Sequence, residues 1–244
     1  AKKSVKAPKK ATTVKPHKKR EESLPRLSSS SHAHAPILTL LLFLVSLSCC
    51  FSIQSGEEYS VTTFATASSL PTMIAMSSFN EMVYITRVSS TSLLAVNRTS
   101  SASSSLSGIN IPNQRGICLS HTFPEWGLVV SWNGIIYKID FQTNSFETFV
   151  GRGGTAMSNG YGTNAQFNGP HGITLSPDDS YALVADYGNH LIRKITMATA
   201  FVDTFAGTSG SAGAVNGYGT NAKLNHPIGV SISPDGTFAL VSNY

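Results

Sequence analysis

The chain has 244 residues and a formal net charge of +5 at pH 7, but the charge is not spread evenly along it. Ten of the 18 basic residues lie within residues 1–26, and the other 218 residues carry 8 basic and 11 acidic side chains. Because a nucleic-acid-binding surface needs an excess of positive charge, the part after residue 26 is not expected to bind nucleic acid. Three cysteines, two of them adjacent, form neither a disulfide framework nor a zinc-binding spacing.

Residues 1–34 are first rich in lysine and then rich in serine, and they show no apolar periodicity. Such a segment cannot bury enough apolar surface to offset the entropy lost on ordering, so we expect a disordered basic tail. Nucleic-acid binding or nuclear import is the alternative role for the lysine run.

Residues 35–53 are nineteen residues without a charge. As a helix they would span about 28 Å, close to the thickness of a bilayer core. The basic cluster precedes this run, which places the N-terminus in the cytosol and the rest of the chain on the luminal or extracellular side. We therefore expect a single-pass signal anchor at 35–53, followed by a stalk at 54–69. A cleaved signal peptide, which would make the protein secreted, is the alternative, and a buried core helix is the third possibility.

The first part of the folded region shows short strand patterns. Two of them lie within residues 72–88, on either side of a turn at 77–81, and residues 93–96 predict a third strand. The serine-rich stretch 100–108 is predicted to be a loop. Asn97 begins the triplet Asn97-Arg98-Thr99, an acceptor pattern for N-glycosylation if this part of the chain is luminal.

A longer pattern recurs along the rest of the chain at an offset of 56 or 57 residues. Within each copy, alternating apolar positions are separated by turn residues such as Ser176-Pro177-Asp178-Asp179. The matching pairs are 160–165 with 217–222, 176–179 with 233–236, and 116–120 with 172–176. Repeated sets of about four short strands are typical of the blades of an antiparallel β-propeller.

We therefore expect an all-β chain of four-stranded blades, with boundaries near 70–108, 109–151, 152–207 and a truncated 208–244. A propeller ring closes with four or more blades, so the chain is expected to be a fragment of a longer protein. The repeat also places Phe167 and Leu224 at equivalent positions. We expect these two side chains to fill the spaces between neighbouring sheets, with Ala165 and Ala222 permitting close approach.

These repeats resemble the NHL-repeat family of β-propellers. The resemblance rests on Phe167–Ile173, on Ser176–Asp178 and on Val184–Ile195. It is specific over residues 151–244 and weak over 59–150. The resemblance implies a propeller fold, a fold that carries many unrelated functions.

Four polar residues near the turns of the third blade are the candidate site residues: His171, Asp186, Asn189 and His190. A metal site in a propeller would gather histidines from several blades, so a turn-capping role is the preferred interpretation of His190. The residue that matches Asp186 in the next repeat is Asn243, which retains the hydrogen-bonding oxygen without the charge. We therefore interpret Asp186 and Asn189 as residues that fix the blade geometry, and we expect Asp186→Asn to change stability little.

The chain contains no nucleophile elbow, no phosphate-binding loop and no HExxH motif, so no catalytic residue, metal or cofactor is expected. We expect a membrane-anchored, extracytoplasmic binding module whose loops bind a protein, a glycan or a small ligand. The alternative, implied by the resemblance to gluconolactonase-like propellers, is a metal-dependent lyase or hydrolase. An enzyme should bring histidine and carboxylate side chains together from at least three blades. A binding module should instead present polar or aromatic loops.

Overall fold

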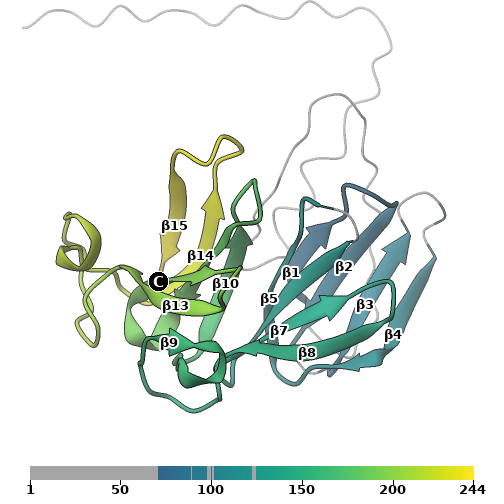
Figure 1. The fold of residues 1–244 in the computed structure, drawn as a ribbon, viewed down its shortest axis with the longest axis horizontal. Coiled ribbons are helices and arrows are strands. Elements are labelled where there is room, and N and C mark those ends of the chain that lie inside the picture. The colour runs from purple at the N-terminus through teal and green to yellow at the C-terminus, as the bar shows by residue number, and fades with distance from the viewer. Residues whose placement is uncertain (1–70, 89, 98–99, 101, 123–124) are drawn as a thin grey trace, which may run out of the picture. The chain divides into compact units, whose positions relative to one another are not determined.

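The computed structural model describes residues 71–244, except residues 89, 98–99, 101 and 123–124. This part of the chain is all-β, and its strands form successive antiparallel sheets (Figure 1). Within it, no helix has the length and apolar character needed to cross a bilayer. The basic tail, the anchor at 35–53 and the stalk at 54–69 that the sequence predicts all lie outside the described residues.

The first sheet has four strands in chain order: β1 (Pro71–Met76), β2 (Met82–Arg87), β3 (Ser92–Asn97) and β4 (Ser103–Asn110). Strand β4 corrects the prediction of a serine-rich loop at 100–108. An outer strand that faces solvent needs few apolar side chains, and Ile109 is the one buried side chain of β4. Its other residues are held by the backbone ladder, in which Ser105 lies opposite Leu94.

The second and third sheets share the same order of four strands. The second sheet contains β5 (Gln114–Leu119), β6 (Trp126–Ser131), β7 (Ile135–Asp140) and β8 (Ser145–Val150). The third contains β10 (Pro170–Leu175), β11 (Tyr181–Asp186), β12 (Leu191–Thr196) and β13 (Phe201–Ala206). The third sheet also has a fifth strand that was not predicted, β9 (Gly160–Tyr161), which pairs with β13. The long loop after β8 thus folds back and satisfies backbone groups on the outer edge of the sheet.

The fourth sheet has two strands among the described residues, β14 (Pro227–Ile232) and β15 (Ala239–Asn243). Strands β1, β5, β10 and β14, the first of each set, contact one another in chain order. Two glycines permit this approach. A Cβ atom on Gly116 would lie 2.3 Å from the carbonyl oxygen of His171, and one on Gly172 would lie 2.6 Å from that of Ile228.

The space between the second and third sheets is filled as the repeat predicts. Phe167 is fully buried in a cluster formed by the second and third sheets, together with Ala165. Leu224, its counterpart, packs against the smaller cluster of the third and fourth sheets. Burial of a side chain as large as Phe167 stabilises the fold by about 1.5–3 kcal/mol. Cys118 also packs against the first of these clusters, where burial raises the pKa of its thiol.

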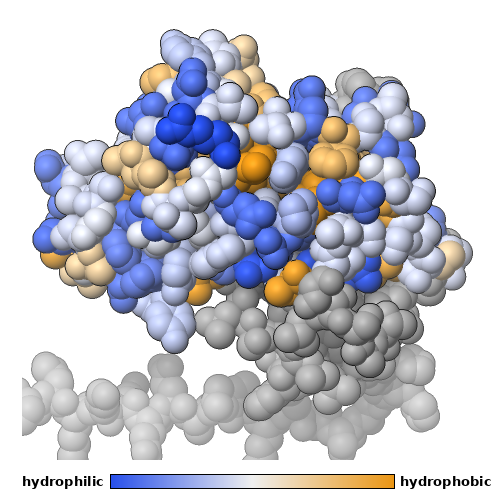
Figure 2. All heavy atoms as spheres, turned by 90° about the horizontal axis from the view of Figure 1, so that it is seen from below, coloured by the Kyte–Doolittle hydropathy of each residue, from blue (hydrophilic) through white to orange (hydrophobic). Residues whose placement is uncertain are grey.

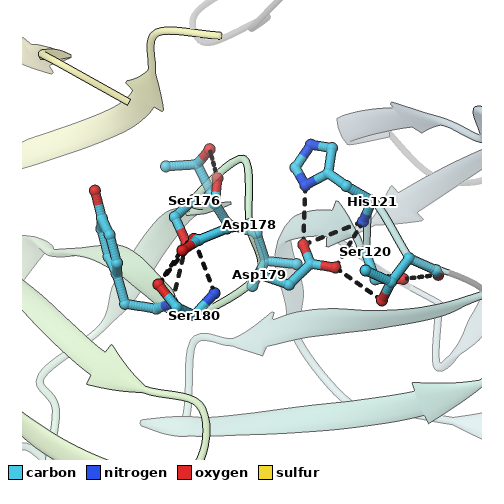
Figure 3. Close-up of polar contacts among 10 residues, drawn as sticks. Ser120, His121, Ser176, Asp178, Asp179 and Ser180 are labelled. Carbon is cyan, nitrogen blue, oxygen red and sulfur yellow. Dashed lines mark hydrogen bonds and ion pairs between the residues drawn. The ribbon is translucent and has the colours of Figure 1, made fainter. Parts of the chain in front are cut away.

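Two neighbouring aspartates in the turn between β10 and β11 point in opposite directions (Figure 3). Asp178 accepts hydrogen bonds from the hydroxyls of Ser176 and Ser180, at 2.7 and 2.8 Å, which lower its pKa to about 2. Asp179 instead reaches the second sheet, where it accepts hydrogen bonds from the backbone N–H of His121 at 2.9 Å and from the Thr122 hydroxyl at 3.1 Å. The imidazole Nδ1 of His121 lies 2.9 Å from the same carboxylate. Asp178 thus shapes its own turn, while Asp179 ties the two sheets together.

Candidate functional site

Figure 2 shows one face of the described residues, on which apolar side chains form small areas separated by hydrophilic ones. Broad, continuous apolar areas mark large protein interfaces, and that face does not show one. A more specific arrangement follows from the register of the sheets, because equivalent positions of successive repeats carry related side chains.

The residue after the second strand of each set is aromatic in three successive repeats. Ser131, Asp186 and Asn243 occupy equivalent places, since each pairs with the first residue of the preceding strand. The residues that follow them are Trp132, Tyr187 and Tyr244. Three rings are therefore placed at the same end of three neighbouring sheets.

Histidines join two of these rings into a continuous arrangement, which we call the aromatic row: Trp132, His171, Tyr187, His226 and His190. The ring centroids of Trp132 and His171 are 5.1 Å apart, and those of His171 and Tyr187 are also 5.1 Å apart. Tyr187 lies 4.6 Å from His226, which lies 4.2 Å from His190. The row thus runs from the second sheet, through the third, to the start of the fourth.

A glycine makes room for the Trp132 end of the row. Gly169 has φ 57° and lies directly against the indole, so that an added Cβ atom would be 2.8 Å from the ring. An L side chain at this position would meet both backbone strain and a steric clash. Glycine at position 169 thus lets the chain before His171 pack directly against Trp132 of the preceding sheet.

Arg115 lies at the same end of the row. Its guanidinium carbon is 5.2 Å from the centroid of the Trp132 ring, a cation–π arrangement. The side chain is half-buried, and its Nη1 donates to the carbonyl oxygen of Gln114 at 3.1 Å. Burial lowers the pKa of the guanidinium, which nevertheless remains charged at neutral pH. Among the described residues, no acidic side chain forms an ion pair with Arg115.

The histidines of the row are held in defined states. Burial, followed by the nearby charge of Arg115, lowers the pKa of His171 to about 4, so this ring is neutral at pH 7. Burial and the neighbouring His226 also lower the pKa of His190. The backbone N–H of His226 donates to Nδ1 of His190 at 3.1 Å, and this acceptor nitrogen therefore carries no proton. The side-chain oxygen of Asn225 lies 2.9 Å from Nδ1 of His226 and fixes that ring.

Neutral amides flank the exposed end of the row. The backbone N–H of Trp132 donates to the carbonyl oxygen of Asn113 at 2.9 Å, and the Asn113 side chain donates to that of Asn133, also at 2.9 Å. Both asparagines are exposed, and Trp132 is 38% exposed. An aromatic face with amide donors and acceptors beside it suits a ligand that has both apolar faces and hydroxyl groups.

Two of the four predicted site residues, His171 and His190, lie in the aromatic row. Asp186 and Asn189 lie instead in a buried network. The Asn189 amide donates to the Asp186 carboxylate at 2.8 Å, as does the backbone N–H of Asn168, also at 2.8 Å. Burial raises the pKa of Asp186, and these hydrogen bonds oppose that shift.

The centre of this network is Arg193, which the sequence interpretation missed. It is fully buried on β12, and its Nη1 is 3.0 Å from the Asp186 carboxylate. The same guanidinium donates to the carbonyl oxygens of Gln166 and Ser158 at 3.0 and 2.9 Å. A signal was present in the sequence, because Arg193 alternates with the apolar residues Leu191 and Ile195 and therefore shares their inward face.

The enzyme alternative calls for histidine and carboxylate side chains that come together from several blades. Within the described part of the chain, no three His, Cys, Asp or Glu side chains come together as a metal-binding group. The aromatic row brings three histidines together from two sheets, but none of its ring contacts or hydrogen bonds among the described residues involves a carboxylate. The chemistry offered by the row is recognition by stacking, hydrogen bonding and one cation.

A separate hollow of about 270 Å³ lies between the third sheet and β14–β15. It is lined mainly by apolar side chains, including Leu183, Phe205 and Phe238. Leu224 also lines it, at the place where its larger counterpart Phe167 fills the preceding space. The hollow is thus an incompletely filled space between sheets, without the convergent polar groups of a ligand site.

Asn97 is the last residue of β3, and the remainder of its glycosylation triplet lies outside the described residues. Its side-chain oxygen accepts a hydrogen bond from the backbone N–H of Ser100 at 2.8 Å. Because residues 98–99 are not described, glycosylation of Asn97 stays a prediction.

No known family model matches the chain, and no curated protein matches its sequence. Solved structures are similar in fold. An auxiliary nutrient binding protein from Bacteroides ovatus ATCC 8483 gives a TM-score of 0.61 at 18% identity, over 71% of this chain and 45% of that chain. Another auxiliary nutrient binding protein, from Bacteroides thetaiotaomicron VPI-5482, gives 0.58 at 19% identity, over 69% and 44%. A chain of a nidogen/laminin complex gives 0.54 at 13% identity, over 72% and 57%.

The chain spans about half the length of these solved structures. At such low identity the likeness concerns the fold alone, and the function of those proteins does not transfer with it. Successive four-stranded antiparallel sheets with contacting inner strands agree with that likeness. The chain has the fold of a β-propeller, made of blade-like sheets.

Proposed function

We propose that this chain is part of a ligand-binding β-propeller, and that the ligand binds on the aromatic row. The observation that carries the proposal is the convergence of side chains from three successive sheets on one line of contacting rings. Trp132 is exposed and the other rings of the row are partly buried. Accessible aromatic side chains with amides and a cation beside them form recognition surfaces, because they offer large contact area at low entropic cost. Among the described residues, no carboxylate takes part in the ring contacts or hydrogen bonds of the row.

The similar structures support a binding role in general terms. Two of them are named as auxiliary nutrient binding proteins, and a third was solved in a complex of two proteins, nidogen and laminin. We further propose that the blades are of the NHL type, on the strength of the motifs at 167–173 and 184–195. A binding module of this kind takes its specificity from loops and strand ends, while the sheets provide a rigid scaffold.

The proposal includes a location. Residues 35–53 would anchor the protein in a membrane with the basic tail in the cytosol, so that the aromatic row faces the lumen or the cell exterior. Protease added to sealed microsomes that contain the full chain should remove the tail and leave the propeller intact. Digestion of the propeller under these conditions would contradict this topology. Release of a soluble, shortened chain would support the secreted alternative.

The binding site can be tested with the full chain and a panel of glycans, peptides and small nutrients. Trp132→Ala and Tyr187→Ala should each weaken binding of whichever panel member binds the unmodified protein. Tyr161→Ala is the matched control, because Tyr161 is 61% exposed and contacts the ring of Phe201, outside the row, at a tilted angle. Unchanged binding by both row variants would show that the ligand binds elsewhere.

A further inference from the structure

The strongest clue to the ligand is the unpaired charge of Arg115. This guanidinium is half-buried beside Trp132, and its side-chain hydrogen bond within the described part of the chain goes to the neutral carbonyl oxygen of Gln114. A half-buried guanidinium is only partly hydrated, and it can bind a carboxylate or a phosphate through strong, charge-assisted hydrogen bonds. Arg115 is thus a part-exposed cation, without an ion-pair partner among the described residues, at the exposed end of the aromatic row.

The contrast with Arg193 supports this interpretation. Arg193 is also close to an aromatic ring, at 5.1 Å from the centroid of Phe167, but it is fully paired with Asp186 and with backbone oxygens. Lys138 and Lys194 likewise lie over the rings of Trp126 and Tyr181. Of these cations, Arg115 alone lies over a ring of the aromatic row, and that ring, Trp132, is 38% exposed.

The rest of the row restricts the kind of anion. A nucleic acid would bring one phosphate per nucleotide and needs several cations along its path. The permanently charged group beside the row is Arg115, and burial keeps the neighbouring His171 neutral at pH 7. The neutral amides of Asn113 and Asn133 beside the ring provide donors and acceptors of the kind that hydroxyl groups need. The ligand therefore needs one flat apolar face, several hydroxyls and few anionic groups.

We propose that the aromatic row binds an acidic carbohydrate, with a uronic acid whose carboxylate pairs with Arg115 while its ring stacks on Trp132. Trp132 supplies the contact area and the asparagines bind hydroxyl groups. Arg115 selects the charged sugar over its neutral counterpart. This inference rests on the proposed binding function and adds the class of ligand.

The test uses titration of the full chain with three probes: a galacturonic acid trimer, its methyl ester and a galactose trimer. The methyl ester retains the ring and the hydroxyls but removes the negative charge. We expect the acid to bind about 10-fold or more tightly than either neutral probe, as the loss of one charge-assisted hydrogen bond implies. Arg115→Gln should bring the affinity for the acid down to that for the ester.

Two further variants separate charge from structure. Arg115→Lys should retain part of the preference for the acid, because the cation is kept while the bidentate geometry is lost. Arg152→Gln is the matched control, since Arg152 is an exposed arginine outside the row that donates to Gln166 at 2.8 Å, and it should leave the preference unchanged. Circular dichroism of each variant should confirm that the sheets remain folded.

The outcomes distinguish this inference from the proposed function. Equal affinity of the unmodified chain for the acid and its ester would overturn the acidic-sugar assignment and leave a binding function at the row intact. Salt-sensitive binding of single-stranded DNA that Arg115→Gln abolishes would also overturn it. If none of the three sugars binds, the ligand class is wrong, whereas the binding function is judged by the Trp132 and Tyr187 variants.

Discussion

The second and third sheets share a register but hold the end of their second strand in different ways. In the second sheet this place is occupied by Ser131, whose hydroxyl donates to the carbonyl oxygen of Pro112 at 2.8 Å. In the third sheet it is occupied by Asp186, which forms a buried ion pair with Arg193 at 3.0 Å. Tyr137 stands in the second sheet where Arg193 stands in the third.

The difference follows the length of the loop that enters each sheet. Three residues, 111–113, connect β4 to β5, whereas residues 151–169 lie between β8 and β10. Arg193 and Asn189 bind backbone oxygens of this longer loop at Gln166, Ser158 and Ala156. The short loop is held by neutral hydrogen bonds, such as that from Ser131 to Pro112, while the long loop is held by a network that contains the Arg193–Asp186 ion pair. The aromatic row contains residues of both sheets. Its geometry therefore depends on the hydrogen bond of Ser131 and on the Arg193–Asp186 network.

The largest expected effect is the loss of one partner of the buried pair. Arg193→Met leaves the carboxylate of Asp186 buried without its cation and should lower the free energy of unfolding by about 3–5 kcal/mol. Urea unfolding of the full chain measures this change. Hydrogen exchange should also show faster exchange in the loop at 152–169. A loss below about 1 kcal/mol would mean that the network does not hold the loop.

Arg193 also changes the expectation for Asp186→Asn. From the sequence, an amide at this position retains the acceptor oxygen and should change stability little. In the structure it would leave a buried guanidinium without its counter-ion, so a marked loss is expected. The double variant Asp186→Asn/Arg193→Met should regain part of the stability lost by either single change, because neither charge then remains unpaired.

The repeated architecture could be predicted from the sequence because each strand carries its own alternating pattern and each turn its own Gly, Pro or Asp. The filling of the inter-sheet space by Phe167 followed from the same repeat. Strands β4 and β9 were missed since an exposed outer strand has few apolar residues and a two-residue strand has no pattern at all. Both are held by backbone pairing, which leaves little trace in side-chain chemistry.

The candidate site was only half predictable for a related reason. His171 and His190 stand in recognisable turn motifs, but their partners Trp132 and His226 come from other repeats. Contacts of this kind depend on how one sheet packs against the next, and no local pattern encodes them. Asp179 shows the same limit, because its turn role can be read locally while its link to His121 spans 58 residues.

A second prediction concerns that link between sheets. Asp179→Gly should lower the free energy of unfolding by about 1–3 kcal/mol, since the backbone N–H of His121 and the hydroxyl of Thr122 lose their hydrogen bonds to a charged acceptor. Glycine is the suitable replacement because Asp179 has φ 55°, and the equivalent Gly236 of the next repeat has φ 71°. Thermal unfolding followed by circular dichroism gives the measurement. Unchanged stability would show that inner-strand packing alone joins the two sheets.

A third prediction is a dependence of stability on pH that originates in the aromatic row. His171 has a pKa of about 4 in the folded chain, below the ordinary histidine value of 6.5. The unfolded chain therefore binds more protons between these values, and stability should fall as pH drops from 6.5 towards 4. After solvent screening we expect about 1–2 kcal/mol from this group. His171→Gln should flatten this part of the profile, and an unaltered slope in the variant would assign the effect to other groups.

The smallest expected effect concerns the uncharged hydrogen bond of Ser131 in the second sheet. Ser131→Ala removes the hydrogen bond to Pro112 and the acceptor for the backbone N–H of Asn133, which lies 3.3 Å from the hydroxyl. Because the connection at 111–113 is short and the groups involved are uncharged, the loss should be about 0.5–1.5 kcal/mol by urea unfolding. Trp132 follows Ser131 directly, so its side chain should also become less well ordered. A change in the fluorescence of Trp132 should therefore accompany the loss of stability. A loss of stability as large as that caused by Arg193→Met would show that the contribution of these loop contacts to stability does not depend on loop length.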